Sequence, residues 1–147
     1  LQAWNIRPHR AEPLFQLARI HRQNGNPRLG YLFAKTAMNI PFPQGDILFL
    51  ANDVYDWQIA DELASSAYYV GDMVAGLEAS NKLLEDKKFP DSEKDRIVNN
   101  FSQYAKWLEE QNAAQQKVQQ ELLQKQVEEK MKRTKAPAPR RKKKAKK

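Results

Sequence analysis

Apolar residues recur at steps of three and four positions over residues 11–40, the spacing of one face of an α-helix. The periodicity breaks at Gly25, and Pro27 stands where a second helix can begin, because the first helical turn has no amide hydrogen bond to lose. The apolar face of the first helix holds Leu14, Leu17, Ala18 and His21, and the second helix carries Leu29, Tyr31, Leu32, Phe33, Ala34, Ala37, Met38 and Ile40. One exposed helix cannot hide that much apolar surface. The pattern therefore predicts a helical hairpin that needs packed neighbours.

A second hairpin is predicted after residue 52. Asn52 or Asp53 is expected to cap its first helix, which runs to about Val70. Gly71 then repeats the Gly25 turn, and the second helix covers 73–84. The core stripe of the first helix consists of Trp57, Ala60, Ala64 and Ala67, and the second helix is expected to bury Met73, Leu77, Leu83 and Leu84. This hairpin is the expected neighbour of the first.

Two other segments complete the region up to Leu108. Between the hairpins, prolines and Gly45 exclude a helix around residues 41–45, and the apolar run at 47–50 is expected to lie across neighbouring helices. A helix start is predicted at 90–95, where Ser92 and Asp95 approximate a capping box. The stripe of the following helix is Ile97, Phe101, Tyr104 and Leu108. We expect it to close the core.

The composition changes after Leu108. Residues 109–133 are rich in Gln, Glu and Lys and predict a polar helix, either a lone, partly frayed one or one paired in a coiled coil or with a partner. Residues 134–147 combine an Ala-Pro repeat with a Lys/Arg run and are expected to be disordered. The sequence thus predicts a helical domain at 1–108, a polar helix at 109–133 and a basic tail at 134–147.

A repeat connects the start of the chain with its first hairpin. Ala3-Trp4-Asn5-Ile6 is echoed by Ala37-Met38-Asn39-Ile40, an offset of 34 residues. That offset is the length of a tetratricopeptide repeat, in which stacked helical hairpins share one core. Two positions depart from the repeat pattern, since His21 and Ala34 stand where aromatic residues are usual. We expect an all-α fold of tetratricopeptide-like stacked hairpins, an α-solenoid, with the first residues ending an earlier unit.

Longer matches make the resemblance more particular. The segments are Arg7-Pro8-His9-Arg10-Ala11-Glu12-Pro13-Leu14, Gly30-Tyr31-Leu32-Phe33-Ala34-Lys35, Ile40-Pro41-Phe42-Pro43, Asp53-Val54-Tyr55-Asp56-Trp57 and Ala67-Tyr68-Tyr69-Val70-Gly71. Together they resemble the tetratricopeptide-like region that accompanies family 2 type glycosyltransferase domains. The resemblance implies a noncatalytic interaction or acceptor-positioning module, the C-terminal part of a longer protein whose catalytic domain lies upstream. The Asp-x-Asp metal motif of such domains is absent here, so no catalytic residue is carried over.

Charge is divided unevenly along the chain. Eleven of the 25 basic residues and none of the 18 acidic ones lie in 130–147, so the body is acidic although the net charge is +7. The tail contains no aromatic residue for base stacking, so any nucleic-acid binding is expected to be nonspecific and salt-dependent. Contact with an anionic membrane, an import signal and a solvated terminus remain alternatives. The tail candidates for nucleic acid or an anionic surface are Arg140, Arg141, Lys142, Lys143, Lys144, Lys146 and Lys147. An adaptor that works through this tail is the alternative function.

Candidate chemistry within the body is sparse. Arg7, His9 and Arg10 could hold a phosphate or carboxylate, against the alternative that the arginines form a network with Glu12. Tyr55, Tyr68 and Tyr69 are candidates for a groove that binds an extended peptide or a glycan. The partners expected are a protein or a glycan acceptor.

Several chemistries are not predicted. Asp53, Asp56, Asp61 and Glu62 are spread around a helix, and we predict neither a metal site nor a cofactor nor catalysis there. The chain has no cysteine, which excludes disulfides and thiol chemistry and agrees with a reducing compartment. No apolar run approaches the roughly 18 residues that cross a membrane. We expect a cytoplasmic protein, while its basic tail is also typical of nuclear targeting.

Overall fold

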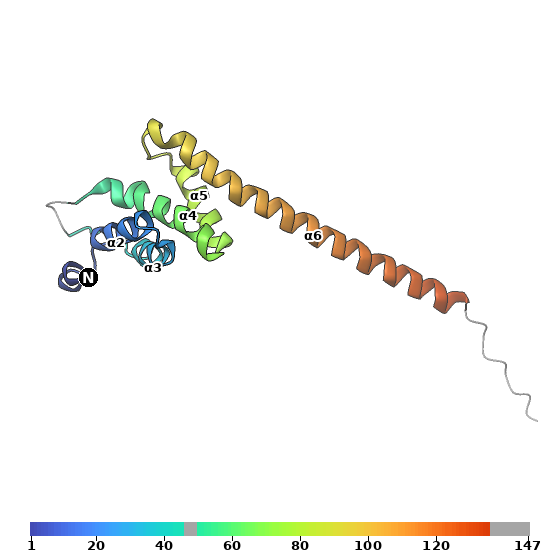
Figure 1. Cartoon of the computed structure of the whole chain (residues 1–147). Helices are drawn as coiled ribbons and strands as arrows, with labels where there is room; N and C mark the ends of the chain where they lie inside the picture. Colours follow the sequence, from blue (N-terminus) through green and yellow to red (C-terminus); the bar gives the residue numbers. More distant parts are fainter. Residues whose placement is uncertain (46–49, 136–147) are drawn as a thin grey trace, which may run out of the picture. The chain divides into compact units, whose positions relative to one another are not determined.

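The computed structural model describes residues 1–45 and 50–135, with side chains up to residue 132. Every regular element in these ranges is helical, which confirms the all-α prediction. The elements are α1 (Gln2–Ile6), α2 (Glu12–Gln23), α3 (Pro27–Met38), a π-helical turn (Val54–Gln58), α4 (Ile59–Val70), α5 (Met73–Asp86), a 3₁₀ turn (Asp91–Glu93) and α6 (Lys94–Lys135) (Figure 1). Contacts divide the chain between Leu108 and Glu109, and each part is described by itself.

The turn between α2 and α3 forms as the sequence predicted. Gly25 has φ +75°, a left-handed conformation that favours glycine. The Asn26 side chain accepts a hydrogen bond from the Leu29 amide at 3.3 Å, and Pro27 occupies the first turn of α3. The two helices pack together because Gly30 lacks a side chain: a Cβ there would lie 3.1 Å from the Ala18 carbonyl oxygen. The first predicted hairpin is confirmed.

Successive helices pack side by side along the first part of the chain: α2 on α3, α3 on α4, and α4 on α5. Alanines supply much of the buried surface, which lets the helix axes approach closely. One buried cluster consists of Ala18, Ala34, Ala60, Leu63, Ala64, Ala79, Leu83 and Ile97, and the other of Ala11, Leu14, Phe15, Ala37, Val54 and Ile59. The predicted stripe of α4 is confirmed, with its three alanines buried and Trp57 partly buried.

The start of α6 closes the second hairpin. Gly71 ends α4 with φ +77°, as its position in the turn predicted. Gly76 on α5 faces the Tyr104 ring, and a Cβ at Gly76 would lie only 2.2 Å from Tyr104 Cε1. Tyr104 is 1 % exposed, and its hydroxyl donates a hydrogen bond to the Ala64 carbonyl of α4. Tyr104 and Ile97 of the predicted stripe are thus buried, whereas Leu108 remains 39 % exposed.

Some local predictions were wrong. The helix after the linker already includes Asn52 and Asp53, and Asp53 makes no side-chain cap hydrogen bond to the π-helical turn. Four side chains predicted to be buried are only partly so: Leu17, Met73, Leu77 and Leu84. The neighbouring helices cover Leu14, Phe15 and Leu83 instead. Leu32 of α3 is 54 % exposed. Periodicity located the helices correctly but misjudged which side chains become enclosed.

The second part of the chain is helical as far as Lys135, as predicted for a polar helix. All side chains described from Glu109 onward are exposed, among them Val118, Leu122, Leu123 and Val127. The choice between a lone helix and a paired one stays a prediction. Of the apolar run at 47–50, only Leu50 is among the described residues, and the tail from residue 136 lies outside them.

Candidate functional site

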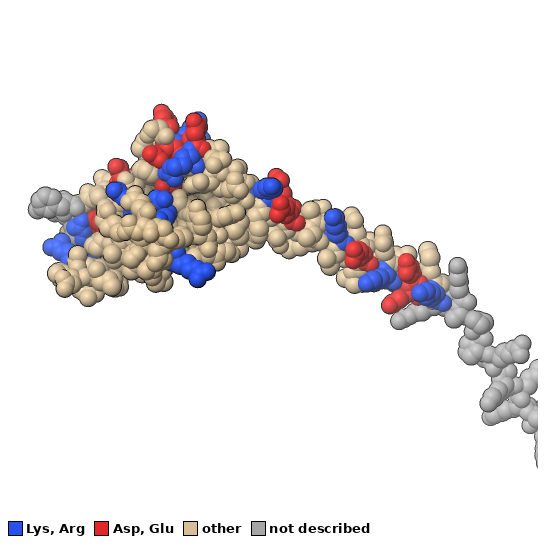
Figure 2. Space-filling view, in the orientation of Figure 1, with Lys and Arg blue, Asp and Glu red and all other residues tan. Residues whose placement is uncertain are grey.

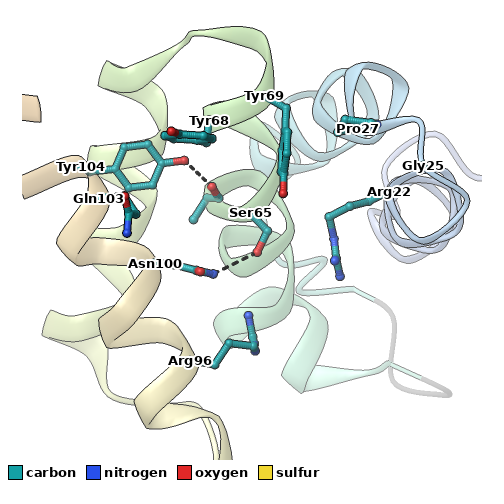
Figure 3. Close-up of a pocket in the computed structure, with 11 residues that line it drawn as sticks. Arg22, Gly25, Pro27, Ser65, Tyr68, Tyr69, Arg96, Asn100, Gln103 and Tyr104 are labelled. Atoms are coloured by element: carbon teal, nitrogen blue, oxygen red, sulfur yellow. Dashed lines mark hydrogen bonds between the residues drawn. The ribbon is translucent and has the colours of Figure 1, made fainter.

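A pocket of about 700 Å³ lies between the α2–α3 turn, α4 and the first turns of α6 (Figure 3). We call this pocket the tyrosine groove. Its lining consists of Arg22, Gly25, Pro27, Ala64, Ser65, Tyr68, Tyr69, Arg96, Asn100, Gln103 and Tyr104. The volume lies in the range of about 300–1,000 Å³ typical of small-ligand sites. Three helices that are far apart in sequence therefore form one concave surface.

Two consecutive tyrosines at the end of α4 form its aromatic wall. Tyr68 is 53 % and Tyr69 65 % exposed, and their rings meet edge to face with centroids 5.8 Å apart. Figure 3 shows Tyr69 reaching into the space between Arg22 and Ser65. The structure thus brings two predicted groove residues to a groove.

Two arginines hold the walls together through ion pairs with neighbouring acids on α4. Arg22 of α2 contacts Glu62 through Nε and Nη2, at 2.6 and 2.9 Å. Arg96 of α6 contacts Asp61 through Nη1 and Nη2, both at 2.9 Å, and Glu93 through Nε at 2.8 Å. Fork-shaped pairs of this kind fix geometry as well as charge. They tie both α2 and α6 to α4.

The carboxylates lie behind the arginines and not on the groove surface. Asp61 and Glu62 are 7 % and 4 % exposed, and neither belongs to the groove lining. Burial raises the pKa of Asp61, although the Arg96 hydrogen bonds act against that rise. The hydrogen bond to Glu62 raises the pKa of Arg22. Both guanidinium groups therefore stay charged, and each is paired with a buried carboxylate that does not line the groove.

The remaining polar groups of the groove are side-chain donors and acceptors. Arg22 Nη1 makes no hydrogen bond to any residue that the structure describes. The Asn100 amide donates a long hydrogen bond of 3.4 Å to Ser65 Oγ, and Gln103 lies one helical turn further along α6. Backbone groups contribute little, because α4 and α6 use theirs within the helices. A ligand in the groove would meet rings, amides, hydroxyls and one guanidinium edge.

The other predicted cluster is organised differently. Arg10 Nε donates to Glu12 Oε2 at 3.1 Å, so the Arg–Glu12 network, one of the two alternatives, is present. Burial would raise the pKa of Glu12, but the hydrogen bonds from Arg10 and Tyr55 outweigh it and the pKa is lowered. Arg7, His9 and Arg10 each have further interactions, so none is a free ligand group.

Tyr55 belongs to that network as well. Its hydroxyl donates to Glu12 Oε2 at 2.7 Å and accepts from the Ala11 amide at 3.0 Å. Burial raises its pKa to about 12. Tyr55 also borders a second pocket, of about 550 Å³, in which its ring packs edge to face against Phe42. Its hydroxyl is thus used to fasten the π-helical turn to the start of α2, away from the tyrosine groove.

Asp56 and His21 both have structural partners. Asp56 accepts a hydrogen bond from Lys88 at 2.6 Å, and His21 stacks on the Phe33 ring at 5.4 Å. Among the described residues, no group of three or more His, Asp or Glu side chains is placed to hold a metal ion. Figure 2 shows acidic and basic side chains interspersed on the visible face.

No helix among residues 1–45 and 50–135 is long and apolar enough to span a membrane. The tail candidates, Arg140 to Lys147, lie outside the described residues.

Comparison with protein-family models, with curated proteins and with solved structures found no match. The groove is therefore interpreted from its own residues. Sequence reasoning missed Arg22, Arg96, Asn100 and Gln103, since they look like ordinary exposed positions. One signal was available: Asp61 and Glu62 interrupt the apolar stripe of α4, and acids in a buried stretch require partners.

Proposed function

We propose that this chain is a noncatalytic helical binding module whose ligand occupies the tyrosine groove. The observation that carries the proposal is the pair Tyr68 and Tyr69, exposed over a pocket of about 700 Å³. Large aromatic side chains left exposed beside convergent polar groups are typical of recognition surfaces. Noncatalytic binding fits the lining, because it offers no histidine or carboxylate to move a proton.

The groove is preorganised for binding. Its walls on α2 and α6 are each fixed to α4 by a fork-shaped ion pair, and Tyr104 joins α6 to α4 by a buried hydrogen bond. A ligand would therefore not have to order these walls, which lowers the entropic cost of binding.

The wider setting of the module is also proposed. We infer that the two hairpins belong to a tetratricopeptide-like stack and that the module positions an acceptor for a glycosyltransferase domain elsewhere in a longer protein. The 34-residue echo and the sequential packing of α2 to α5 support the stack. The link to glycosyltransferases is supported by sequence resemblance alone. Determining the coding sequence upstream of Leu1 tests it: a nucleotide-sugar-binding domain is expected, and an unrelated domain would refute the link.

A second candidate function follows from the charge division. An adaptor that holds nucleic acid or an anionic surface through residues 135–147 is favoured by the concentration of basic residues there. This function does not involve the tyrosine groove, so the two proposals can be tested separately.

A direct experiment tests binding at the groove. The full chain is applied to arrays of oligosaccharides and of unstructured peptides, beside the variants Tyr69→Ala and Leu32→Ala. Leu32 is a matched control, because it is 54 % exposed on α3 and lies outside the groove lining. Groove binding predicts that array signals fall in Tyr69→Ala and persist in Leu32→Ala. Equal signals from all three proteins would refute it.

A further inference from the structure

Each arginine that lines the tyrosine groove is already paired with at least one carboxylate before any ligand arrives. Two arginines, Arg22 and Arg96, face three carboxylates, those of Asp61, Glu62 and Glu93. An incoming phosphate or carboxylate would find no net positive charge, and it would have to give up its hydration. A cationic ligand is also disfavoured, because the groove lining contains the two arginines but none of the three carboxylates. The electrostatics therefore favour an uncharged ligand.

The polar groups that face the groove match a ligand with many hydroxyl groups. Arg22 Nη1 offers donors, the amides of Asn100 and Gln103 offer both donors and acceptors, and the hydroxyls of Ser65 and Tyr69 can do either. The planar guanidinium and amide groups can each bind two adjacent hydroxyls of a ligand at once. A purely apolar ligand would leave them without partners at a cost of about 1–3 kcal/mol each.

The aromatic wall adds a flat apolar contact. The Tyr68 and Tyr69 rings are perpendicular, with an interplanar angle of 88°, so they present faces in two directions. The face of an aromatic ring is electron-rich and attracts C–H groups that carry partial positive charge. Sugar rings combine such a C–H face with a rim of hydroxyls.

We propose that the tyrosine groove binds an uncharged carbohydrate, with sugar rings stacked on Tyr68 and Tyr69 and hydroxyls bonded to Arg22, Asn100 and Gln103. This inference rests on the proposed binding function and names the ligand class of the same site. A peptide is the less suitable occupant. A peptide that binds as an added strand needs a free sheet edge, and an amphipathic helix needs a continuous apolar groove. A proline-rich peptide can also dock in an aromatic-lined groove, but it would leave the amide and guanidinium donors of this groove without partners. The groove has helical walls, with Pro27 and Ala64 as its only small apolar lining residues besides Gly25.

The test uses the full chain and three sets of probes. The first is a panel of neutral oligosaccharides of hexose, N-acetylhexosamine and deoxyhexose units. The second contains sulfated and uronic-acid counterparts, and the third unstructured peptides. Each set is applied at low and at high salt, because binding through the basic tail weakens steeply with salt whereas neutral binding does not. The best probe is then titrated calorimetrically.

The variants separate ring stacking from general damage. Tyr69→Ala removes the ring, Tyr69→Phe keeps it, Gln103→Ala removes one amide, and Leu32→Ala is the control. Arg22 and Arg96 are left unchanged, because removing either strands a buried carboxylate. Circular dichroism and thermal unfolding confirm that each variant is folded.

The expected result is salt-independent binding of a neutral oligosaccharide that weakens at least about tenfold in Tyr69→Ala and less than about threefold in Tyr69→Phe and in Leu32→Ala. Peptide binding that depends on Tyr69 would overturn the carbohydrate inference and leave the binding function intact. Failure of every neutral oligosaccharide up to a Kd of about 1 mM would also overturn it. Carbohydrate binding that is equal in Tyr69→Ala and wild type would refute both the inference and the groove as a binding site.

Discussion

Replacing Gly76 by alanine tests the packing that creates one wall of the tyrosine groove. The new Cβ would lie 2.2, 2.3 and 2.4 Å from Cε1, Cζ and Oη of Tyr104. Atoms cannot approach so closely, so the Tyr104 ring has to move. That ring is 1 % exposed, and its hydroxyl is bonded to the Ala64 carbonyl. We therefore expect Gly76→Ala to displace the start of α6 from α4 and α5.

The magnitude combines three contributions. Overpacking a filled site costs about 1–3 kcal/mol. Losing the Tyr104 hydrogen bond adds about 0.5–1.5 kcal/mol. Alanine in a helix is better than glycine by about 1 kcal/mol, which offsets part of this cost. The expected net loss in the free energy of unfolding is about 0.5–3.5 kcal/mol.

The assay is urea unfolding followed by circular dichroism, for wild type, Gly76→Ala, Tyr104→Leu and the double variant. Leucine lacks the three ring atoms that the Cβ would meet, so the alanine should then cost less than about 0.5 kcal/mol or become stabilising through helix propensity. Glu78→Ala, at an exposed position of the same helix, is the control and should change stability by less than about 0.5 kcal/mol.

Two results would contradict this account. If Gly76→Ala stabilises the wild-type chain, the ring does not lie against Gly76. If its cost is the same in the Tyr104→Leu background, the strain arises from something other than the ring.

Three further predictions concern the turns, the pH dependence and the tail. Gly71→Ala should lower the free energy of unfolding by about 1–2 kcal/mol in urea, because φ at Gly71 is +77°. The cost is conformational, since no described atom lies within 4 Å of the new Cβ. Gly45→Ala, which is equally uncrowded by described atoms but has no positive φ, should cost less, and equal costs would contradict the prediction. The Tyr31 hydroxyl, then Lys35 and the Ala75 amide, hold the pKa of Asp72 at about 2, below its usual 3.8. Because the folded-state pKa is lowered, the stability that Asp72 contributes is present above pH 3.8 and is lost as the pH falls toward 2. Urea unfolding should therefore show that the difference in stability between wild type and Asp72→Asn shrinks over that range. A difference that does not depend on pH would refute the assignment. Deleting residues 135–147 should abolish retention of RNA at low salt, and retention by the truncated chain would place RNA binding in the helical body.

The helices and turns could be predicted because their causes are local. Gly25 and Gly71 adopt positive φ and Pro27 starts a helix for reasons contained within a few residues. Burial was harder to predict. Leu14 and Leu17 share one helix face in the sequence pattern, but only the position of the neighbouring helix decides that Leu14 is enclosed and Leu17 is not.

The groove was predicted in part for the same reason. Tyr68 and Tyr69 are consecutive near a helix end, so the sequence indicates that at least one of them is exposed, and the structure leaves both exposed. The pairs Arg22–Glu62 and Arg96–Asp61 join residues 40 and 35 positions apart, and no local rule connects them. Tyr55 was predicted to line the same groove as Tyr68 and Tyr69, because the sequence does not reveal its hydrogen bond to Glu12, 43 positions away.

The proposed function requires that this chain binds its ligand in the tyrosine groove. Chemical-shift mapping of the isotope-labelled full chain, titrated with the neutral oligosaccharide and peptide panels, tests it most directly. If the ligand occupies the groove, backbone and side-chain signals should shift together at Ser65, Tyr69, Asn100 and Gln103, which line the groove from α4 and α6. Shifts confined to the second pocket around Phe42 and Tyr55, or to the basic tail, would contradict it.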